Sequence, residues 1–293
     1  SASLKAIDVD RSSLDDAALA SAIADELLLG GPDVEVALHG STRRVPASIR
    51  RPAIPGPSPI QAGDVVVVSG GARGVTSACV IAWAKATQAR FVLLGRSALT
   101  DEPASCAGID SDADLKKALL LAARAAGEKP SPRDLQRQVS SVLSGREIRA
   151  TVAAIAAAGG EARYVSVDVC DTAALTGALN VVRKDWGPVR GVVHGAGVLA
   201  DRLIAEQTDE QFDRVWTTKI DGLKALMAAV GDDDLKVLCF FSSVAARCGN
   251  NGQVAYAMAN EALNKLAWAE RARRPGLLVK SLGWGPWKGG MVS

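Results

Sequence analysis

The chain has 293 residues, of which 48% are hydrophobic and 23% charged, so it can bury the core of one large domain, alone or with a small one. A formal net charge of +2 gives no reason to expect binding to nucleic acid or to a membrane surface. No apolar run reaches the length of a membrane span, and no secretion signal opens the chain. Five cysteines without a C-x-x-C pair indicate free thiols rather than a zinc or disulfide framework. These bounds fit a cytoplasmic enzyme without a metal site.

Residues 1–60 are expected to form a region of their own. AALASAIADELLLGG predicts a helix that ends in glycine, and DVEVALHG predicts a short strand. RRPAIPGPSPIQAG follows with four prolines, at positions 52, 55, 57 and 59, which exclude regular structure. We therefore expect a small N-terminal subdomain that ends in a linker.

From VVVVS onwards, apolar runs alternate with helical patterns. We expect six strands, near residues 65–69, 90–94, 163–167, 190–194, 236–242 and 278–282. Nearly uniformly apolar strands separated by helices predict a parallel sheet that is covered on both faces. The expected fold class of residues 61–293 is therefore α/β, a doubly wound, Rossmann-like sheet.

One segment, residues 99–145, interrupts this alternation. It contains DADLKKALLLAARAAGEKPSPRDLQRQVSSVLSG, which predicts two amphipathic helices separated at Pro130 and Pro132. We expect a helical insertion between the second strand and the helix REIRATVAAIAAAGG. A packing or docking role is the simplest interpretation, and the segment is assigned no chemistry.

The segment SGGARGVT follows the first strand directly and opens a helix, which is the context of a dinucleotide-binding loop. Glycines allow the tight turn and let the backbone approach a pyrophosphate, while the helix N-terminus supplies amide donors. The loop residues predicted to contact the cofactor are Gly70, Gly71, Ala72, Arg73, Gly74 and Val75.

The end of the second strand, LLGRS, indicates which nucleotide is bound. No acidic residue stands where a ribose 2′-hydroxyl would need an acceptor, and Arg96 and Ser97 stand there instead. Arg96 alone could be a solvated surface arginine. Together with Arg73 it would place two guanidinium groups near a 2′-phosphate, which favours NADPH over NADH.

A tyrosine and an asparagine four residues apart, Tyr256 and Asn260, would share one face of a helix. Ser243, at a strand end, and Lys219, on an earlier helical stretch, would join them. When a ketone is reduced, the developing alkoxide needs a proton, and Tyr256 is its expected donor. A free phenol has a pKa of about 10, so the charge of Lys219 is expected to lower that pKa and make the phenol an acid-base group that works near neutral pH. Ser243 would bind a substrate carbonyl, and Asn260 would orient the lysine or a water molecule.

These residues resemble the ketoreductase (KR) domains of type I polyketide synthases and polyunsaturated fatty acid synthases, which belong to the short-chain dehydrogenase/reductase superfamily. In that family the lysine and asparagine are exchanged relative to most short-chain dehydrogenases, as they are here. SGGARGVT is similar to the family's T-G-x-x-x-G-x-G, with Ser69 in place of threonine and Thr76 in place of the last glycine. Thr76 is expected to shift the loop slightly. The resemblance extends over the whole chain and includes the VLADRLI loop and the long insertion.

The resemblance implies further roles around the nucleotide. Lys219 and Tyr256 would also contact the cofactor, and His194, in HGAG, would be structural rather than catalytic. Trp284 and Trp287 could equally be core aromatics. The remaining implied cofactor contacts are Asp168 and Val169 beside adenine, Gly195, Ala196 and Gly197 beside the nicotinamide ribose, and Gly285, Pro286 and Trp287 beside the nicotinamide.

The resemblance also implies a substrate. Leu199-Ala200-Asp201 is similar to the L-D-D motif of KR domains that form the 3R alcohol, although Ala200 departs from it. The tryptophan of the other stereochemical class is replaced by Phe240. The implied reaction is the NADPH-dependent reduction of a β-ketoacyl chain that acyl carrier protein holds through phosphopantetheine, inside a synthase whose other domains are partners.

In the family, a lid helix and a final strand follow the segment GGM, whereas this sequence ends at Ser293, so we expect both elements to be either cut away or too mobile to appear. Two alternatives stay open. One is a structural domain without catalysis, against which the intact tyrosine, serine, lysine and asparagine argue. The other is a stand-alone reductase or dehydrogenase of free alcohols. The lysine–asparagine exchange argues against it, as does the N-terminal region, which resembles the tail of the structural subdomain that braces the catalytic subdomain in the KR family.

Overall fold

The chain divides into two compact units, Ser1–Gly56 and Pro57–Ser293. The structure, a computed structural model, describes residues 4–52 and 56–287. Ile60, the last residue of the expected N-terminal region, is buried in the core of the second unit beside Val66 and Phe91. The division therefore falls before the end of the proline-rich segment rather than after it.

The first unit is a three-stranded sheet with one helix. Its elements are β1 (Ala6–Val9), α1 (Asp16–Leu29), β2 (Glu35–His39) and β3 (Thr42–Arg44). β2 pairs in parallel with β1 and antiparallel with β3. The Asp15 carboxylate accepts a hydrogen bond from the Ala18 amide and so begins α1, because a helix N-terminus leaves its first amides without partners.

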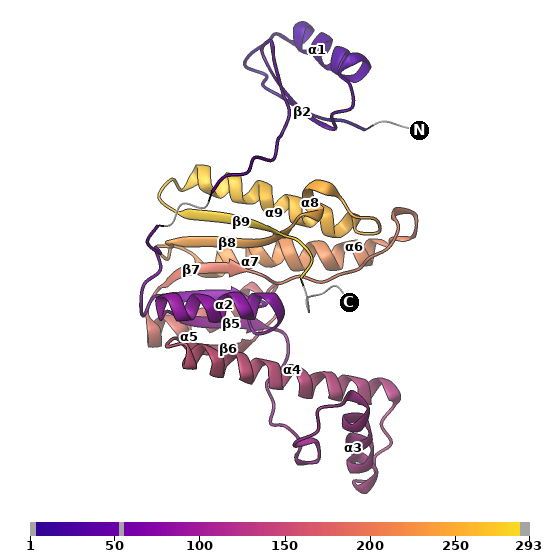
Figure 1. Cartoon of the computed structure of the whole chain (residues 1–293), viewed down its shortest axis with the longest axis vertical. Helices are drawn as coiled ribbons and strands as arrows, with labels where there is room; N and C mark the ends of the chain where they lie inside the picture. The colour runs from indigo at the N-terminus through magenta and orange to yellow at the C-terminus, as the bar shows by residue number, and fades with distance from the viewer. Residues whose placement is uncertain (1–3, 53–55, 288–293) are drawn as a thin grey trace. The chain divides into compact units, whose positions relative to one another are not determined.

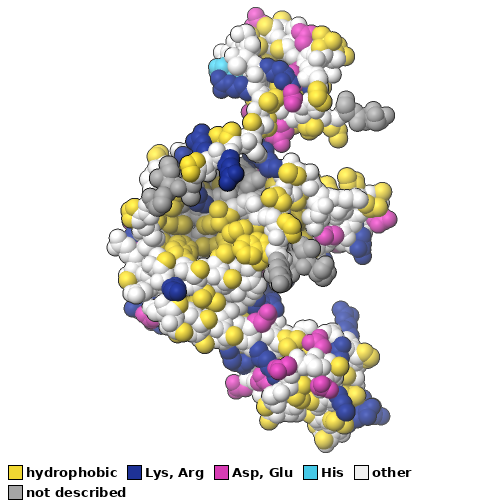
Figure 2. Space-filling view, in the orientation of Figure 1, with side chains coloured by type: hydrophobic (Ala, Val, Ile, Leu, Met, Phe, Trp, Pro, Cys, Tyr) yellow, Lys and Arg dark blue, Asp and Glu magenta, His cyan; other side chains and the backbone are white. Residues whose placement is uncertain are grey.

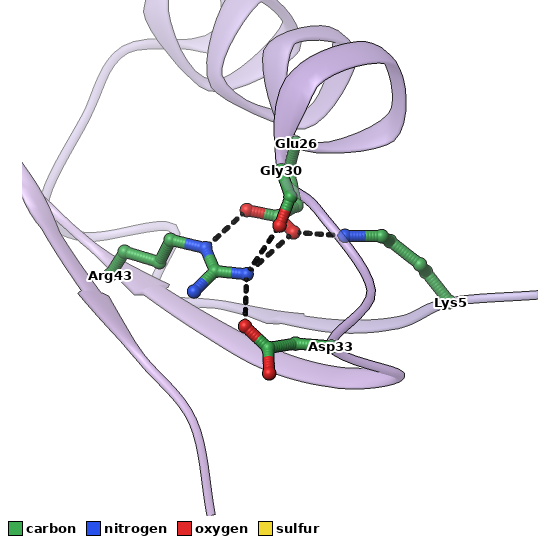
Figure 3. Close-up of polar contacts among 5 residues, drawn as sticks. All are labelled: Lys5, Glu26, Gly30, Asp33 and Arg43. Carbon is green, nitrogen blue, oxygen red and sulfur yellow. Dashed lines mark hydrogen bonds and ion pairs between the residues drawn. The ribbon is translucent and has the colours of Figure 1, made fainter.

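A group of ion pairs holds this small unit together (Figure 3). The Glu26 carboxylate is buried and accepts hydrogen bonds from Lys5 and from Arg43, with Arg43 Nε 2.6 Å from Glu26 Oε2. Arg43 Nη2 also donates to Asp33 Oδ2, at 2.9 Å, and to the Gly30 carbonyl, at 2.8 Å. These hydrogen bonds lower the pKa of Glu26 to about 2.

The second unit is built on a parallel sheet of six strands in the order β6-β5-β4-β7-β8-β9 (Figure 1). The strands are β4 (Val65–Ser69), β5 (Arg90–Gly95), β6 (Glu161–Ser166), β7 (Val189–His194), β8 (Val237–Ser243) and β9 (Leu278–Trp284). The predicted parallel α/β sheet is confirmed. The strand order changes direction between β4 and β7, and in sheets of this kind ligands bind beyond the carboxyl ends of the strands at that point.

Helices cover both faces of this sheet. α2 (Gly74–Thr87) and α4 (Pro132–Ala157) pack on one face, and α5 (Thr172–Trp186), α7 (Gly222–Val230) and α9 (Val254–Arg273) pack on the other. Successive side chains of a strand point to opposite faces of the sheet. Val66 and Val68 therefore belong to the core on the side of α2 and α4, and Val65 and Val67 to the core on the side of α5, α7 and α9. Figure 2 shows hydrophobic side chains gathered in a hollow over β8 and β9.

The insertion is a helical hairpin of α3 (Asp112–Ala125) and α4 with a small core of its own, made by Cys106, Leu115, Leu119, Val139 and Val142. α4 differs from the expectation, because it runs unbroken through residue 145 and includes the helix that was expected to follow the insertion. Gly145 lies inside it, although glycine costs a helix interior roughly 1 kcal/mol relative to alanine. Ile148 and Ile155 are buried against the sheet and offset that cost.

The second unit also contains the shorter helices α6 (Asp209–Trp216) and α8 (Ala245–Cys248), 3-10 turns at Ala104–Cys106 and Ile204–Glu206, and a π-helical turn at Thr217–Asp221. In the part of the chain that the structure describes, no helix is both long enough and apolar enough to cross a membrane. The five cysteines are free thiols. Within the same residues, no group of three or more His, Cys, Asp or Glu side chains could hold a metal ion.

Candidate active site

A cavity of about 1410 Å³ lies at the carboxyl ends of the parallel strands. Its wall is made by segments that follow β4, β5, β6, β7, β8 and β9, so residues far apart in the sequence meet there. Every site residue predicted above lines this cavity except Gly71, Asp201 and Asn260.

The glycine loop needs glycine for two different reasons. Gly70 and Gly74 have positive φ angles, +68° and +60°, which favour glycine. A Cβ on Gly71 would lie 2.6 Å from Val68 Cγ1, so Gly71 faces the sheet instead of the cavity. A Cβ on Gly74 would meet nothing within 4 Å, so this backbone borders open space at the start of α2. A bare backbone at a helix N-terminus beside a large cavity fits the pyrophosphate of a dinucleotide.

Thr76 stands where the family motif has its last glycine, and the structure shows what accommodates it. Its side chain is buried, and a Cβ on Gly195 would lie 2.8 Å from Thr76 Oγ1 and 2.9 Å from Cγ2. Thr76 therefore packs against the backbone of Gly195, directly after β7, where the absence of a side chain leaves room for it.

His194 joins the glycine loop to the segment that carries Lys219. Its Nδ1 lies 2.8 Å from the Ser69 hydroxyl, and its Nε2 lies 2.9 Å from the backbone carbonyl of Lys219. Because a carbonyl can only accept, Nε2 carries the proton and Nδ1 accepts from Ser69. Burial, with the nearby charge of Lys219, lowers the pKa of His194 to about 3, so the ring is neutral. Both ring nitrogens are used within the protein, as a structural role requires.

Lys219 lies in the π-helical turn with 2% of its surface exposed. Its Nζ donates to the Phe241 carbonyl, at 3.0 Å, and lies 5.7 Å from the centre of the Tyr256 ring. Burial lowers the pKa of Lys219 to about 8. A Cβ on Gly197 would lie 3.1 Å from Lys219 Cε, so the lysine reaches the cavity across a glycine.

Tyr256 differs from the expectation in its ionisation. Burial raises the pKa of Tyr256, and hydrogen bonding with the side chains of Ser243 and Asn260 opposes that effect without reversing it. Lys219 does not contribute to this pKa in the present arrangement, in which its ammonium group donates to the Phe241 carbonyl. Ser243 lies beside the phenol at the end of β8, where its hydroxyl accepts from the Ala245 amide at 3.1 Å.

Two of the predicted site residues, Asn260 and Asp201, do not line the cavity but bond to residues that do. Asn260 is fully buried, and its Nδ2 donates to the Tyr256 carbonyl at 2.8 Å, one helical turn away. Among the described residues, its Oδ1 has no hydrogen-bond partner. The Asp201 carboxylate accepts from Gln253 Nε2 at 2.8 Å, and Gln253 itself lines the cavity.

The two arginines that were predicted to bind a 2′-phosphate both line the cavity. Arg73 Nη1 donates to the Ser144 hydroxyl of α4, at 2.6 Å. The strand exit that carries Arg96 is held by Tyr164, whose hydroxyl donates to the Ser97 carbonyl at 2.7 Å.

Several residues in this wall or directly behind it were not predicted from the sequence. Ser144 and Glu147, one turn apart on α4, and Tyr164, on β6, have no motif around them, and their contacts join segments more than sixty positions apart. Trp284 could have been placed, since its motif was recognised. Its ring packs edge-on against Phe241, 5.3 Å between ring centres, and against Trp287, 5.0 Å away. The GGM end of that motif lies outside the described residues.

Comparison with solved structures finds the same fold in known enzymes. The ketoreductase from the first module of phoslactomycin biosynthesis in a Streptomyces species superposes with a TM-score of 0.67 at 26% identity, over 98% of this chain and 55% of the other. A short-chain dehydrogenase from Mycobacterium paratuberculosis, solved with NAD bound, superposes with a TM-score of 0.57 at 20% identity, over 77% and 73% of the two chains. The second likeness concerns the fold alone.

The sequence comparisons are more specific. The chain is 46% identical over 242 residues to one of the subunits of the polyunsaturated fatty acid synthase from a Thraustochytrium species, a match that covers 80% of this chain and 8% of that protein. The chain thus spans a small part of the curated relatives that it matches. A family model described as KR domain matches residues 64–289, which is most of the second unit. With a match of that extent on this fold, the chain belongs to the KR domain family, oxidoreductases that act on a keto group with a nicotinamide cofactor.

Proposed function

We propose that this chain is an NADPH-dependent ketoreductase domain that reduces a β-ketoacyl group to the 3R alcohol. The acyl chain would be carried by the phosphopantetheine of an acyl carrier protein, inside a multidomain polyketide or polyunsaturated fatty acid synthase. The observation that carries this proposal is that one cavity has a glycine loop and two arginines on its wall together with Lys219, Ser243 and Tyr256.

The cavity fits a dinucleotide in size and in the chemistry of its walls. The glycine loop would hold the pyrophosphate, Arg73 and Arg96 the 2′-phosphate, and Lys219 the nicotinamide ribose. Asp168 and Val169 would lie beside adenine, and Pro286 and Trp287 beside the nicotinamide. When bound, NADPH supplies the hydride for the keto carbon.

The residues of the chain supply the proton. The Tyr256 phenol, whose pKa burial raises above its ordinary value, is protonated at neutral pH and can donate to the alkoxide that develops on the keto oxygen. The Ser243 hydroxyl, beside that phenol, would donate to the same oxygen and hold it in place. Lys219, charged at pH 7 since its pKa is about 8, lies 5.7 Å from the centre of the ring and would stabilise the phenolate left behind by turning from the Phe241 carbonyl towards it. Asn260 would hold a water molecule with its free Oδ1 and so return a proton to this site.

The stereochemical proposal rests on the loop after β7. Leu199 lies on the cavity wall, and Asp201 acts through Gln253, which it holds by a hydrogen bond. These residues would direct the acyl chain to one side of the nicotinamide, so that hydride reaches one face of the ketone.

The proposal is tested by measuring NADPH oxidation with a β-ketoacyl thioester, for the chain and for Tyr256→Phe. We expect Tyr256→Phe to lose a factor of about 10² or more in kcat, since positioned proton transfer contributes that much, and to keep its affinity for NADPH. Tyr164→Phe removes the chain's other phenol and is expected to weaken cofactor binding without abolishing turnover. Undiminished turnover by Tyr256→Phe would refute the role of the phenol. NADPH binding without any turnover would favour a structural domain, and a preference for free over carrier-bound ketones would favour a stand-alone reductase.

A further inference from the structure

The insertion helix α4 contacts the glycine loop and the chain that follows the Arg96–Ser97 strand exit. Its residues Ser144 and Glu147 approach Arg73, and Glu147 itself lines the cavity. We infer that α4 sets the cofactor specificity of this domain, with Ser144 and Glu147 as positioning residues that act on the 2′-phosphate through Arg73. This inference rests on the proposed function, in which the cofactor is NADPH.

Ser144 favours phosphate binding by fixing a flexible cation. The Arg73 side chain is half exposed, at 49%, and a free arginine would lose much side-chain entropy on binding a ligand. The Ser144 hydroxyl, which is buried, accepts from Nη1 and so orders the guanidinium group before the cofactor arrives. Among the described residues, Nε and Nη2 of Arg73 have no partner, which leaves two donors for two of the oxygens of one phosphate.

Glu147 acts in the opposite direction. Its Oε2 lies 3.9 Å from Arg73 Nη1, and its side chain is 59% exposed, so the pair is weak and in contact with solvent. A carboxylate at this place competes with a phosphate for Arg73 and repels the phosphate's own charge. Ser144 therefore orders Arg73 for binding a 2′-phosphate, while Glu147 limits the affinity for that phosphate.

Other contacts of α4 keep this geometry in place. Thr151 Oγ1 donates to the Ala72 carbonyl at 2.9 Å, beside Arg73 in the glycine loop. On the other side, Arg149 donates to the Thr100 carbonyl, and Arg146 forms a two-armed ion pair with Glu102, with Nη2 2.6 Å from Oε1. α4 is thus bonded both to the loop that carries Arg73 and to the chain that follows Arg96, so its position governs the distance between them.

The test is a fluorescence titration of the whole chain with NADPH and with NADH, for Ser144→Ala, Glu147→Gln and the unaltered protein. Ser144→Ala removes one hydrogen bond and is expected to weaken NADPH binding about fivefold. Glu147→Gln is expected to tighten NADPH binding about twofold to threefold, as suits an exposed ion pair. Neither variant should change the Kd of NADH, which has no 2′-phosphate, and that constancy also shows that the variants fold. Ser141→Ala, an exposed serine of the same helix, is the matched control and should change neither Kd.

An Arg73→Ala background decides whether the effect passes through the arginine, because there Ser144→Ala should have no further effect on NADPH. Equal changes in the Kd of NADPH and NADH would overturn the inference, as would an undiminished effect of Ser144→Ala in the Arg73→Ala background. Failure of the proposed function looks different. A protein that binds NADPH tightly, with a ratio of Kd values that follows Ser144 and Glu147, but reduces no ketone would refute the proposed reaction and leave this inference standing.

Discussion

Replacing Lys219 by methionine should abolish catalysis and at the same time stabilise the fold. The lysine is 2% exposed, and burial lowers its pKa from 10.5 to about 8. A shift of that size corresponds to about 3 kcal/mol by which folding disfavours the charged form. Methionine has a similar length and no charge, so Lys219→Met removes this cost. It also loses the hydrogen bond to the Phe241 carbonyl, so we expect a net gain at pH 7 of about 1–3 kcal/mol.

The pH dependence gives the sharper measurement. Between pH 8 and 10.5 the unfolded chain keeps the proton of Lys219 while the folded chain has lost it, so the stability of the unaltered protein rises with pH in this range. Urea denaturation from pH 7 to 10.5 should therefore show the advantage of Lys219→Met shrinking by about 3 kcal/mol. Lys224→Met, which removes an exposed lysine, controls for the loss of one charge. An advantage for Lys219→Met that is the same at every pH would refute the argument.

Three further changes test other contacts. His194→Leu removes one hydrogen bond each from the buried Ser69 hydroxyl and the Lys219 carbonyl and should cost about 2–4 kcal/mol in urea denaturation, and a cost below 1 kcal/mol would contradict the hydrogen bonds assigned to the ring. Gly195→Ala places a Cβ 2.8 Å from Thr76 Oγ1 and should cost about 1–3 kcal/mol; adding Thr76→Ala should restore part of the loss, and no restoration would refute the contact. Arg43→Met should destabilise the first unit at pH 7. In the unaltered protein the stability of this unit falls as Glu26 takes up a proton between pH 4.5 and 2, and Arg43→Met should make that fall smaller, which NMR signals of the unit would detect.

The parallel sheet could be predicted because its strands are short, nearly uniform apolar runs that no helix pattern explains. The run VVVVS shows this best, since its valines are buried alternately on the two faces. The glycine loop could also be predicted, because its backbone angles restrict the residue type within a few positions. In both cases a local physical requirement is written directly in the sequence.

The contacts that tune the site could not be predicted in the same way. The partner of Arg73 is Ser144, seventy-one positions later, and nothing near either residue indicates the pairing. The insertion was expected to end near Gly145, before a separate helix. The structure instead has one helix, α4, through Gly145, because residues buried on both sides of this glycine stabilise the helix. The direction of the Tyr256 pKa followed from how deeply the phenol is buried and from where the lysine points, and both depend on packing.

The hydrogen bond between Ser69 and His194 has a consequence for how the protein forms. The two residues are 125 positions apart, at the ends of neighbouring strands β4 and β7. During synthesis β4 gains one neighbour, β5, early, but its other neighbour β7 exists only after more than a hundred further residues have emerged. Contacts between such distant residues slow folding because a long loop must close first. The glycine loop after Ser69 and the turn that carries Lys219 are thus joined through His194 only late in synthesis, so a partly made chain lacks the arrangement of the two that the cavity requires.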